Sequence, residues 1–180
     1  MLKDFDISKF KKEKPPSNDS FTTAQEVKAL AKIAVNKNFV KEKDDMRGSF
    51  QKVFKKHSIK FPSKKFESIK NQTLDILMEL KKHYNRPRPS VIAKKMNIDI
   101  GSIVDMDSAK TPSYPSGHSA QAYLLAMLFS SDFPKAKKDL MKLAKDTSYS
   151  RNMAKAHYKS DSVFGIKIGK AMYNHIKNKA

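Results

Sequence analysis

Cysteine is absent from the 180-residue chain. The protein therefore has no disulfide framework, no thiolate nucleophile and no cysteine-based zinc site. The first residues carry charges where a signal peptide needs an apolar run, and no stretch approaches the roughly 20 apolar residues of a membrane-spanning helix. We therefore expect a single soluble, cytoplasmic domain without a transmembrane segment.

Acidic residues and arginines are also scarce. The 37 Lys and Arg residues outnumber 18 Asp and Glu, which gives a formal charge of +19. This charge favours acidic partners such as phosphates, nucleic acid or anionic membrane surfaces, although lysines spread along the whole chain also simply solvate a surface. Arginine binds phosphate through two parallel hydrogen bonds, so an arginine kept among so many lysines suggests a function. The arginines are Arg47, Arg86, Arg88 and Arg151.

The spacing of apolar residues predicts an all-α, single-domain helical bundle without strands or internal repeats. A polar arm over residues 1–20 precedes a helical domain over residues 21–180. Thr23 and Glu26 form a plausible capping box for the first helix, and Gly165 and Gly169 would allow close helix packing. Loops are expected around 44–48 and over 98–115. The predicted helices cover about 23–35, 63–84, 91–96, 116–129, 132–145 and 148–177.

Lys81 and Arg88 lie on either side of the end of the predicted 63–84 helix. A lysine on the last helical turn and an arginine on the rigid segment fixed by Pro89 can converge on one anion. Basic residues at a helix C-terminus also complement the helix dipole without any ligand, and this pair alone favours that simpler interpretation.

Ser116, Gly117 and His118 precede the most apolar predicted helix. Ser116 is a favourable N-cap, Gly117 lets the backbone approach a ligand closely, and the free N–H groups of a helix start point toward an anion. His118 would then lie beside that anion, ready to donate a proton. An ordinary helix cap followed by a surface histidine explains these residues equally well.

Arg151, His157 and Asp161 fall within the predicted 148–177 helix. Four residues separate His157 from Asp161, so both lie on one helix face, and the aspartate can bind one imidazole nitrogen while the other attacks. Arg151 lies near the same face. A surface ion pair is the simpler alternative. However, Asp161 is the only acidic residue after Asp146, so a chance pairing of His157 with an acid is less expected in this basic stretch.

Together these clusters supply the parts of a phosphoryl-transfer site, and their order matches a known signature. The matching segments are Lys81-x6-Arg88-Pro89, Pro115-Ser116-Gly117-His118 and Ser150-Arg151-x5-His157-x3-Asp161. This pattern resembles the tripartite motif of the type 2 phosphatidic acid phosphatase superfamily. That group includes bacterial non-specific acid phosphatases, membrane lipid phosphatases and vanadium-dependent haloperoxidases. The resemblance implies a helical bundle with the active site between helices.

The resemblance also implies which residues would bind phosphate. Lys81, Arg88 and Arg151 would hold the phosphate oxygens. Ser116 and Gly117 would add hydrogen bonds, Gly117 through its backbone N–H.

The catalytic roles implied by the resemblance fall on three residues. His157 would be the nucleophile that forms a phosphohistidine, and Asp161 would orient its ring. His118 would protonate the leaving oxygen and then help to activate water. No metal and no other cofactor is implied, and vanadate would act as an inhibitor.

The chain departs from the family at Lys155, where members often carry glycine two residues before the nucleophile. If that glycine permits close packing or substrate access, Lys155 changes the local packing and the shape of the substrate site. It could instead bring an additional positive charge toward an anionic substrate. The sequence leaves both interpretations open.

We therefore expect a metal-independent phosphatase that hydrolyses phosphate monoesters of small molecules through His157. One alternative is a soluble lipid-phosphate phosphatase that docks on anionic membrane surfaces through its positive charge. Another is a vanadate-dependent haloperoxidase, although relatives with that activity have much longer chains. A basic nucleic-acid-binding protein with an inactive site belongs to a different class, and the few arginines and the missing aromatic-rich basic motif disfavour it. The oligomeric state stays open.

Overall fold

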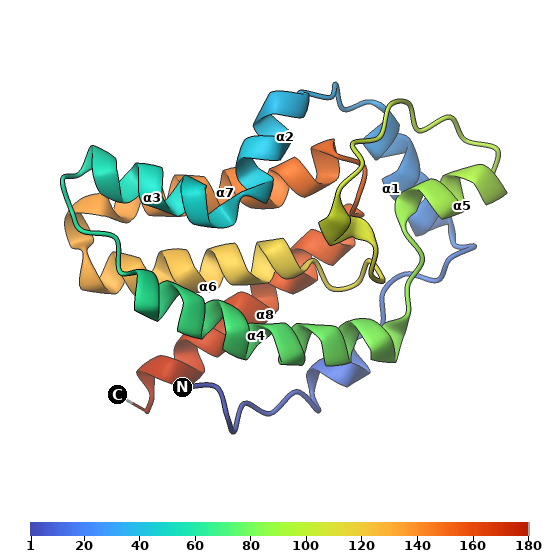
Figure 1. Cartoon of the computed structure of the whole chain (residues 1–180). Coiled ribbons are helices and arrows are strands. Elements are labelled where there is room, and N and C mark those ends of the chain that lie inside the picture. Colours follow the sequence, from blue (N-terminus) through green and yellow to red (C-terminus); the bar gives the residue numbers. More distant parts are fainter. Residues whose placement is uncertain (180) are drawn as a thin grey trace.

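A computed structural model describes residues 1–179, and all regular structure in that range is helical (Figure 1). No strand occurs among these residues, so the prediction of an all-α fold is confirmed. The described residues also form three short 3-10 helices: η1 (Phe10–Lys12) precedes the first longer helix, and η2 (Asp107–Ala109) and η3 (Pro134–Ala136) lie between longer helices. The longer helices are α1 (Phe21–Ala31), α2 (Lys37–Asp44), α3 (Met46–Lys56), α4 (Ser63–Tyr84), α5 (Pro89–Lys95), α6 (Gly117–Asp132), α7 (Lys137–Met153) and α8 (Lys159–Lys177).

Helix α6 lies at the centre of the bundle, packed along α7 and α8, with α4 against another of its sides (Figure 1). Its side chains are apolar around most of the helix, as expected for a helix that is enclosed by others. Ser116 is its N-cap and accepts a hydrogen bond from Ser119 N at 3.3 Å, so the predicted start of this helix is correct. Its fully enclosed apolar side chains are Ala120, Ala122, Leu124, Leu125, Ala126 and Phe129.

Two glycines set how closely α8 approaches α6. A Cβ atom on Gly165 would lie within 3.0 Å of the backbone oxygen of Ser116, and one on Gly169 equally close to that of Ala120. Real Cβ atoms essentially never come that near to such an oxygen. The prediction that these glycines allow close helix packing is therefore confirmed, and the start of α6 lies directly against α8.

The segment before α1 packs on the bundle. Leu2 and Phe10 are buried in the main core, and the N–H of Leu2 donates to Gln72 Oε1 of α4 at 3.0 Å. Edge-to-face aromatic contacts, such as that of Phe54 with Phe129, join α3 to α6 in the same core. The first third of the chain and the last third therefore share one hydrophobic core.

The predictions for residues 20–62 need two corrections. Ser20, whose side chain accepts from Thr23 N, is the N-cap of α1, so the proposed capping box one turn later is wrong. The loop expected at 44–48 is also wrong, because Asp45 accepts from Gly48 N and starts α3 there. A single capping aspartate thus separates α2 from α3 without a longer turn.

The continuous helix expected over 148–177 is interrupted. The break expected at 146–147 is absent, because α7 runs through it and ends at Met153, and α8 starts only at Lys159. Lys155 has a φ of 60°, and the bonds Lys155 N to Asn152 O and Ala156 N to Arg151 O close a Schellman motif at the end of α7. Glycine usually occupies this left-handed position. Because a lysine stands there, the sequence carries no local signal for the end of the helix.

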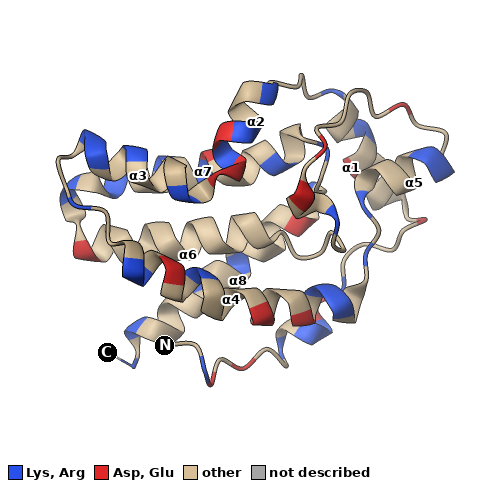
Figure 2. Cartoon of the chain, viewed as in Figure 1, with Lys and Arg blue, Asp and Glu red and all other residues tan. Residues whose placement is uncertain are grey.

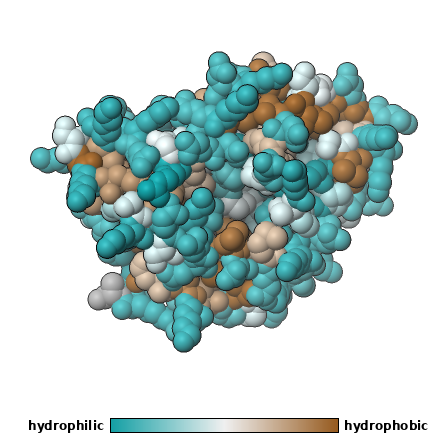
Figure 3. Space-filling model, in the orientation of Figure 1, coloured by the Kyte–Doolittle hydropathy of each residue, from teal (hydrophilic) through white to brown (hydrophobic). Residues whose placement is uncertain are grey.

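The surface combines dispersed positive charge with small apolar areas. Lys and Arg lie on almost every helix in Figure 2, and the face drawn in Figure 3 is mostly hydrophilic with separate hydrophobic patches. Within residues 1–179, no helix combines the length and the apolar composition that crossing a lipid bilayer requires.

The close contact between α6 and α8 can be tested with Gly169→Ala. We expect the free energy of unfolding to fall by about 1–3 kcal/mol, because the new methyl group forces α8 away from the Ala120 carbonyl. Urea denaturation measures the difference. Lys170→Ala, at the exposed neighbouring position, should change stability by less than about 0.5 kcal/mol. Equal stability of the two variants would contradict this role for the glycine.

Candidate active site

Residues from all three sequence motifs meet around one cavity of about 280 Å³. Lys81 reaches it from the last turn of α4, Gly117 and His118 from the first turn of α6, and His157 from the link between α7 and α8. The bundle therefore brings together segments that lie up to 76 positions apart (81 to 157) in the sequence.

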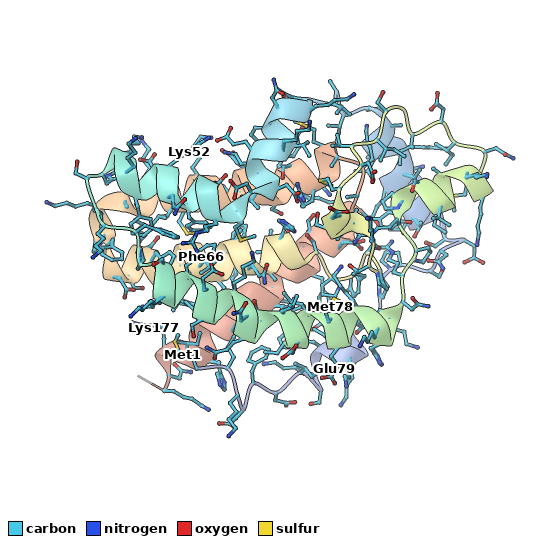
Figure 4. All side chains as sticks on the ribbon, viewed as in Figure 1. Met1, Lys52, Phe66, Met78, Glu79 and Lys177 are labelled. Carbon is cyan, nitrogen blue, oxygen red and sulfur yellow. The ribbon has the colours of Figure 1, made fainter. Side chains whose placement is uncertain are left out.

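One wall of the cavity is apolar. Leu74, Leu77 and Met78 of α4 line it. Figure 4 shows Met78 on the edge of α4 turned toward α6, with Glu79 on the opposite edge, where it pairs with Lys11. The cavity thus has a polar end at the histidines and an apolar side along α4.

His157 is held from both of its ring nitrogens. Its Nδ1 lies 3.1 Å from Asp161 Oδ2, and its Nε2 lies 3.0 Å from Arg88 Nη1. Tyr158 N also donates to Asp161 Oδ2 at 3.1 Å, at the start of α8. His157 itself lies before that helix, so the expectation that it shares a helix face with Asp161 is wrong, although the two side chains do meet.

The environment of His157 favours a neutral ring. Burial lowers the pKa of His157 well below its usual value, and the positive charges of Arg88 and Lys81 act in the same direction. An imidazole that donates through Nδ1 to Asp161 keeps a lone pair on Nε2. Arg88 covers that lone pair, so its guanidinium has to turn toward an incoming anion before Nε2 is free.

Lys81 and Arg88 are anchored by backbone carbonyls of the segment before α6, and Arg88 also by one in the link after α7. Lys81 Nζ donates to Pro112 O, and Arg88 donates to Thr111 O and Ala156 O, both at 2.7 Å. Burial, with Arg88 nearby, lowers the pKa of Lys81 to about 7. Burial likewise lowers the pKa of Arg88 to about 10, so it stays charged at neutral pH.

Ser116 and Gly117 contribute differently to the site. Ser116 is fully buried, and its Oγ accepts from Ser119 Oγ at 2.9 Å, so this hydroxyl mainly fixes the start of α6. A Cβ on Gly117 would lie 3.9 Å from Lys81 Cε. The glycine therefore leaves the cavity open beside the Lys81 side chain.

Arg151 and His118 share a partner that the sequence patterns did not reveal. Asp44, at the end of α2, lies with Oδ1 2.7 Å from Arg151 Nη1 and 3.3 Å from His118 Nε2, and it also accepts from Ser108 Oγ at 2.9 Å. The contact with His118, aided by Arg151, holds the pKa of Asp44 well below its usual range. Burial lowers the pKa of His118, whereas Asp44 opposes that change.

The geometry gathers a histidine with an orienting acid, a second histidine and several cations around one cavity. A sequence profile of the PAP2 superfamily matches residues 72–178, more than half of the chain. The chain belongs to the PAP2 superfamily. This membership agrees with the resemblance to the type 2 phosphatidic acid phosphatases and indicates phosphatase-type chemistry on a phosphoric ester. A comparison with curated proteins gives no match.

The structure explains what replaces the glycine that PAP2 proteins often carry before the nucleophile. Lys155 is buried, and its Nζ donates to the backbone oxygens of Leu30 and Ile33 (2.8 Å for the latter) at the end of α1. It is not among the residues that line the cavity. Lys155 therefore ties the link before His157 to α1 and brings no charge to the PAP2 cavity.

The sequence patterns gave two further side chains near the PAP2 site, Arg86 and Glu26, no role in it. Arg86 stood out only because arginines are rare, and Glu26 was assigned to a helix cap. Arg86 Nη1 donates to Asp161 Oδ1 at 2.7 Å, and Glu26 Oε2 lies 3.3 Å from Arg86 Nη2. No sequence rule pairs residues separated by 60 positions or more, so these contacts could come only from the fold. Residues 1–179 contain no group of three or more His, Asp or Glu suited to a metal ion.

The lowered pKa of Lys81 predicts how anion binding depends on pH. Above pH 7 Lys81 is largely neutral in the free protein and must take up a proton when a dianion binds, so affinity falls as pH rises. For sulfate, which stays a dianion, we expect the dissociation constant to increase roughly 10-fold between pH 6 and pH 8. Isothermal titration calorimetry measures it. Lys81→Met should bind more weakly and with little pH dependence, and a pH-independent wild type would contradict the prediction.

Proposed function

We propose that this PAP2 protein is a metal-independent phosphatase that hydrolyses phosphate monoesters through a phosphohistidine on His157. The observation that carries the proposal is that the rings of His157 and His118 line one cavity together with Lys81. The bond between His157 Nδ1 and Asp161 adds the orientation that a nucleophilic imidazole needs.

In the first step, His157 Nε2 attacks phosphorus while the bond to the ester oxygen breaks. Arg88 turns from Nε2 to a phosphate oxygen, and Lys81 with the N-terminus of α6 stabilises the charge on the others. His118 gives its proton to the leaving oxygen, which departs as an alcohol. Asp161 stabilises the positive charge that the His157 ring acquires.

In the second step, water attacks the phosphohistidine. His118, now neutral, takes a proton from the water, and the bond between phosphorus and Nε2 breaks to release inorganic phosphate. The enzyme returns to its starting protonation state. Vanadate, which adopts a five-coordinate shape like that of the transition state, would occupy the same cavity and inhibit.

The nucleophile can be tested by hydrolysis of an aryl phosphate between pH 4 and pH 8 in the presence of a metal chelator. We expect turnover in the wild type, and a loss of at least about 10⁴-fold in kcat for His157→Ala. His83→Ala is a matched control, because His83 is exposed, its ring contacts the Lys11 carbonyl and Tyr84, and it does not line the cavity.

Quenching the wild type in an alkaline denaturant, in which the phosphorus–nitrogen bond of phosphohistidine survives, should trap labelled phosphate on a histidine, and His157→Ala should trap none. Full activity in His157→Ala, or activity that the chelator abolishes, would overturn the proposed mechanism.

The apolar wall favours a second candidate for the substrate, a phosphate ester with an alkyl chain, such as a lipid phosphate at a membrane surface. Leu74, Leu77 and Met78 line the cavity on the α4 side. Leu74 is 53% exposed, so the apolar wall continues to the protein surface. A chain lying on this wall would leave water, which is worth about 0.8 kcal/mol for each buried methylene group.

A series of alkyl phosphates of increasing length tests this candidate. We expect kcat/KM to rise about 3- to 4-fold for each methylene that reaches the wall. Leu74→Ser should flatten that dependence, and Val163→Ser is the control, because Val163 on α8 is equally exposed (54%) but lies outside the cavity lining. A kcat/KM that does not change with chain length would leave the short-chain monoesters as the substrates.

A further inference from the structure

Arg86 is a buried arginine that the PAP2 signature leaves unassigned, because it falls in the variable stretch between Lys81 and Arg88. Its side chain is 1% exposed. Nη1 donates to Asp161 Oδ1 at 2.7 Å and to Ser160 Oγ at 2.8 Å. The guanidinium therefore lies behind the orienting acid, on the side away from His157.

The two oxygens of Asp161 have separate partners. Oδ2 accepts from His157 Nδ1 and from Tyr158 N, whereas Oδ1 accepts from Arg86. Asp161 is completely buried, and within the described residues Arg86 is the only lysine or arginine in ion-pair contact with it. A buried carboxylate without such a partner takes up a proton or moves toward water.

Arg86 is itself fixed from several directions. Its guanidinium carbon lies 3.8 Å from the centre of the Tyr158 ring, a close cation–π contact. Glu26 of α1 lies 3.3 Å from Nη2 and also accepts from Ser160 N at 2.6 Å. Helix α1 and the first turn of α8 thus hold the guanidinium between them, and little rotational freedom remains.

We propose that Arg86, held in place by Glu26, is a positioning residue that fixes Asp161 against His157. Arg86 does not touch the cavity, so it acts on the reaction only through the aspartate. The proposal rests on the proposed function, since it concerns how the nucleophile of that reaction is oriented.

The charge on Arg86 sets how the aspartate responds to pH. Burial raises the pKa of Asp161, and Arg86 is the largest influence that lowers it again, with Lys81 acting in the same direction. Without the guanidinium, the pKa of Asp161 rises, and the carboxylate is lost at a higher pH than in the wild type. The ionisable groups that face Asp161 or its arginine are Lys81, Arg86, Arg88, Tyr114, His157, Tyr158 and Glu26.

The first test compares Arg86→Met with Arg47→Met in aryl phosphate hydrolysis across pH. Methionine keeps much of the buried volume but has no charge and no donor. For Arg86→Met we expect kcat to fall roughly 100-fold with KM changed less than about 3-fold, a smaller loss than the about 10⁴-fold that follows neutralisation of an orienting aspartate itself. The acidic limb of the kcat–pH profile should move to higher pH. Arg47, whose partner is the surface Glu67, should give a wild-type profile.

Two more variants separate positioning from general damage. Arg86→Lys keeps the positive charge but lacks the planar guanidinium with its fixed set of N–H donors. The acidic limb of its kcat–pH profile should therefore lie at the wild-type pH, while its maximal kcat stays below that of the wild type. Arg86→Met should cost little further activity in an Asp161→Asn background, because both changes remove the same interaction. The proposal would be overturned if the losses of the two single variants multiplied in the double variant. It would also be overturned if the acidic limb of Arg86→Met lay at the wild-type pH.

A readout that needs no turnover keeps this proposal distinct from the proposed function. In histidine-labelled protein, the Nδ1 proton of His157 should give a slowly exchanging NMR signal at pH 7. In Arg86→Met this signal should be lost at pH 7 and return at higher pH, when Asp161 ionises. A signal unchanged from the wild type would overturn the proposal even if no phosphate ester were hydrolysed. If the signal behaves as expected and no ester is cleaved, only the proposed function fails.

Discussion

The site depends on one ionised carboxylate that has no access to water. Asp161 is completely buried, a position that costs several kcal/mol unless charge and hydrogen-bonding partners compensate. Its partners come from two segments: the guanidinium of Arg86 precedes α5, whereas the ring of His157 and the backbone N–H of Tyr158 belong to the link between α7 and α8. Satisfying this one group therefore fixes where those segments meet, and the geometry around His157 follows from it.

Close packing of α6 on α8 brings the start of α6, which carries His118, next to Asp161 and His157. The glycines of α8 let the backbone of α6 approach, and Ser116 N donates to the carbonyl of Asp161 at 3.0 Å. The helix start that carries His118 is consequently attached to the turn that carries the orienting acid. A helix end with free N–H groups and a buried acid with its histidine thus belong to one rigid junction.

Sequence patterns predicted the parts of the structure that local rules control. Helix α4 and the Ser116 cap followed from periodicity, proline positions and capping preferences, and at least one residue of each motif lines the same cavity. The end of α7 was missed because Lys155 occupies a left-handed position that favours glycine. Asp44 and Glu26 were missed as partners because ion pairs between distant segments depend on tertiary packing, and periodicity identifies a buried face without identifying what covers it.

Helix α1 makes the functional unit larger than the part of the chain that family comparison recognises. The PAP2 match starts at residue 72, inside α4, yet Glu26 of α1 holds Arg86, and the carbonyls at the end of α1 bind Lys155. A fragment limited to the matched residues would split a helix, leave the buried Lys155 without its carbonyl acceptors and deprive the buried Arg86 of Glu26. Evolutionary exchange of the amino-terminal third between relatives would accordingly require compensating changes at both basic residues.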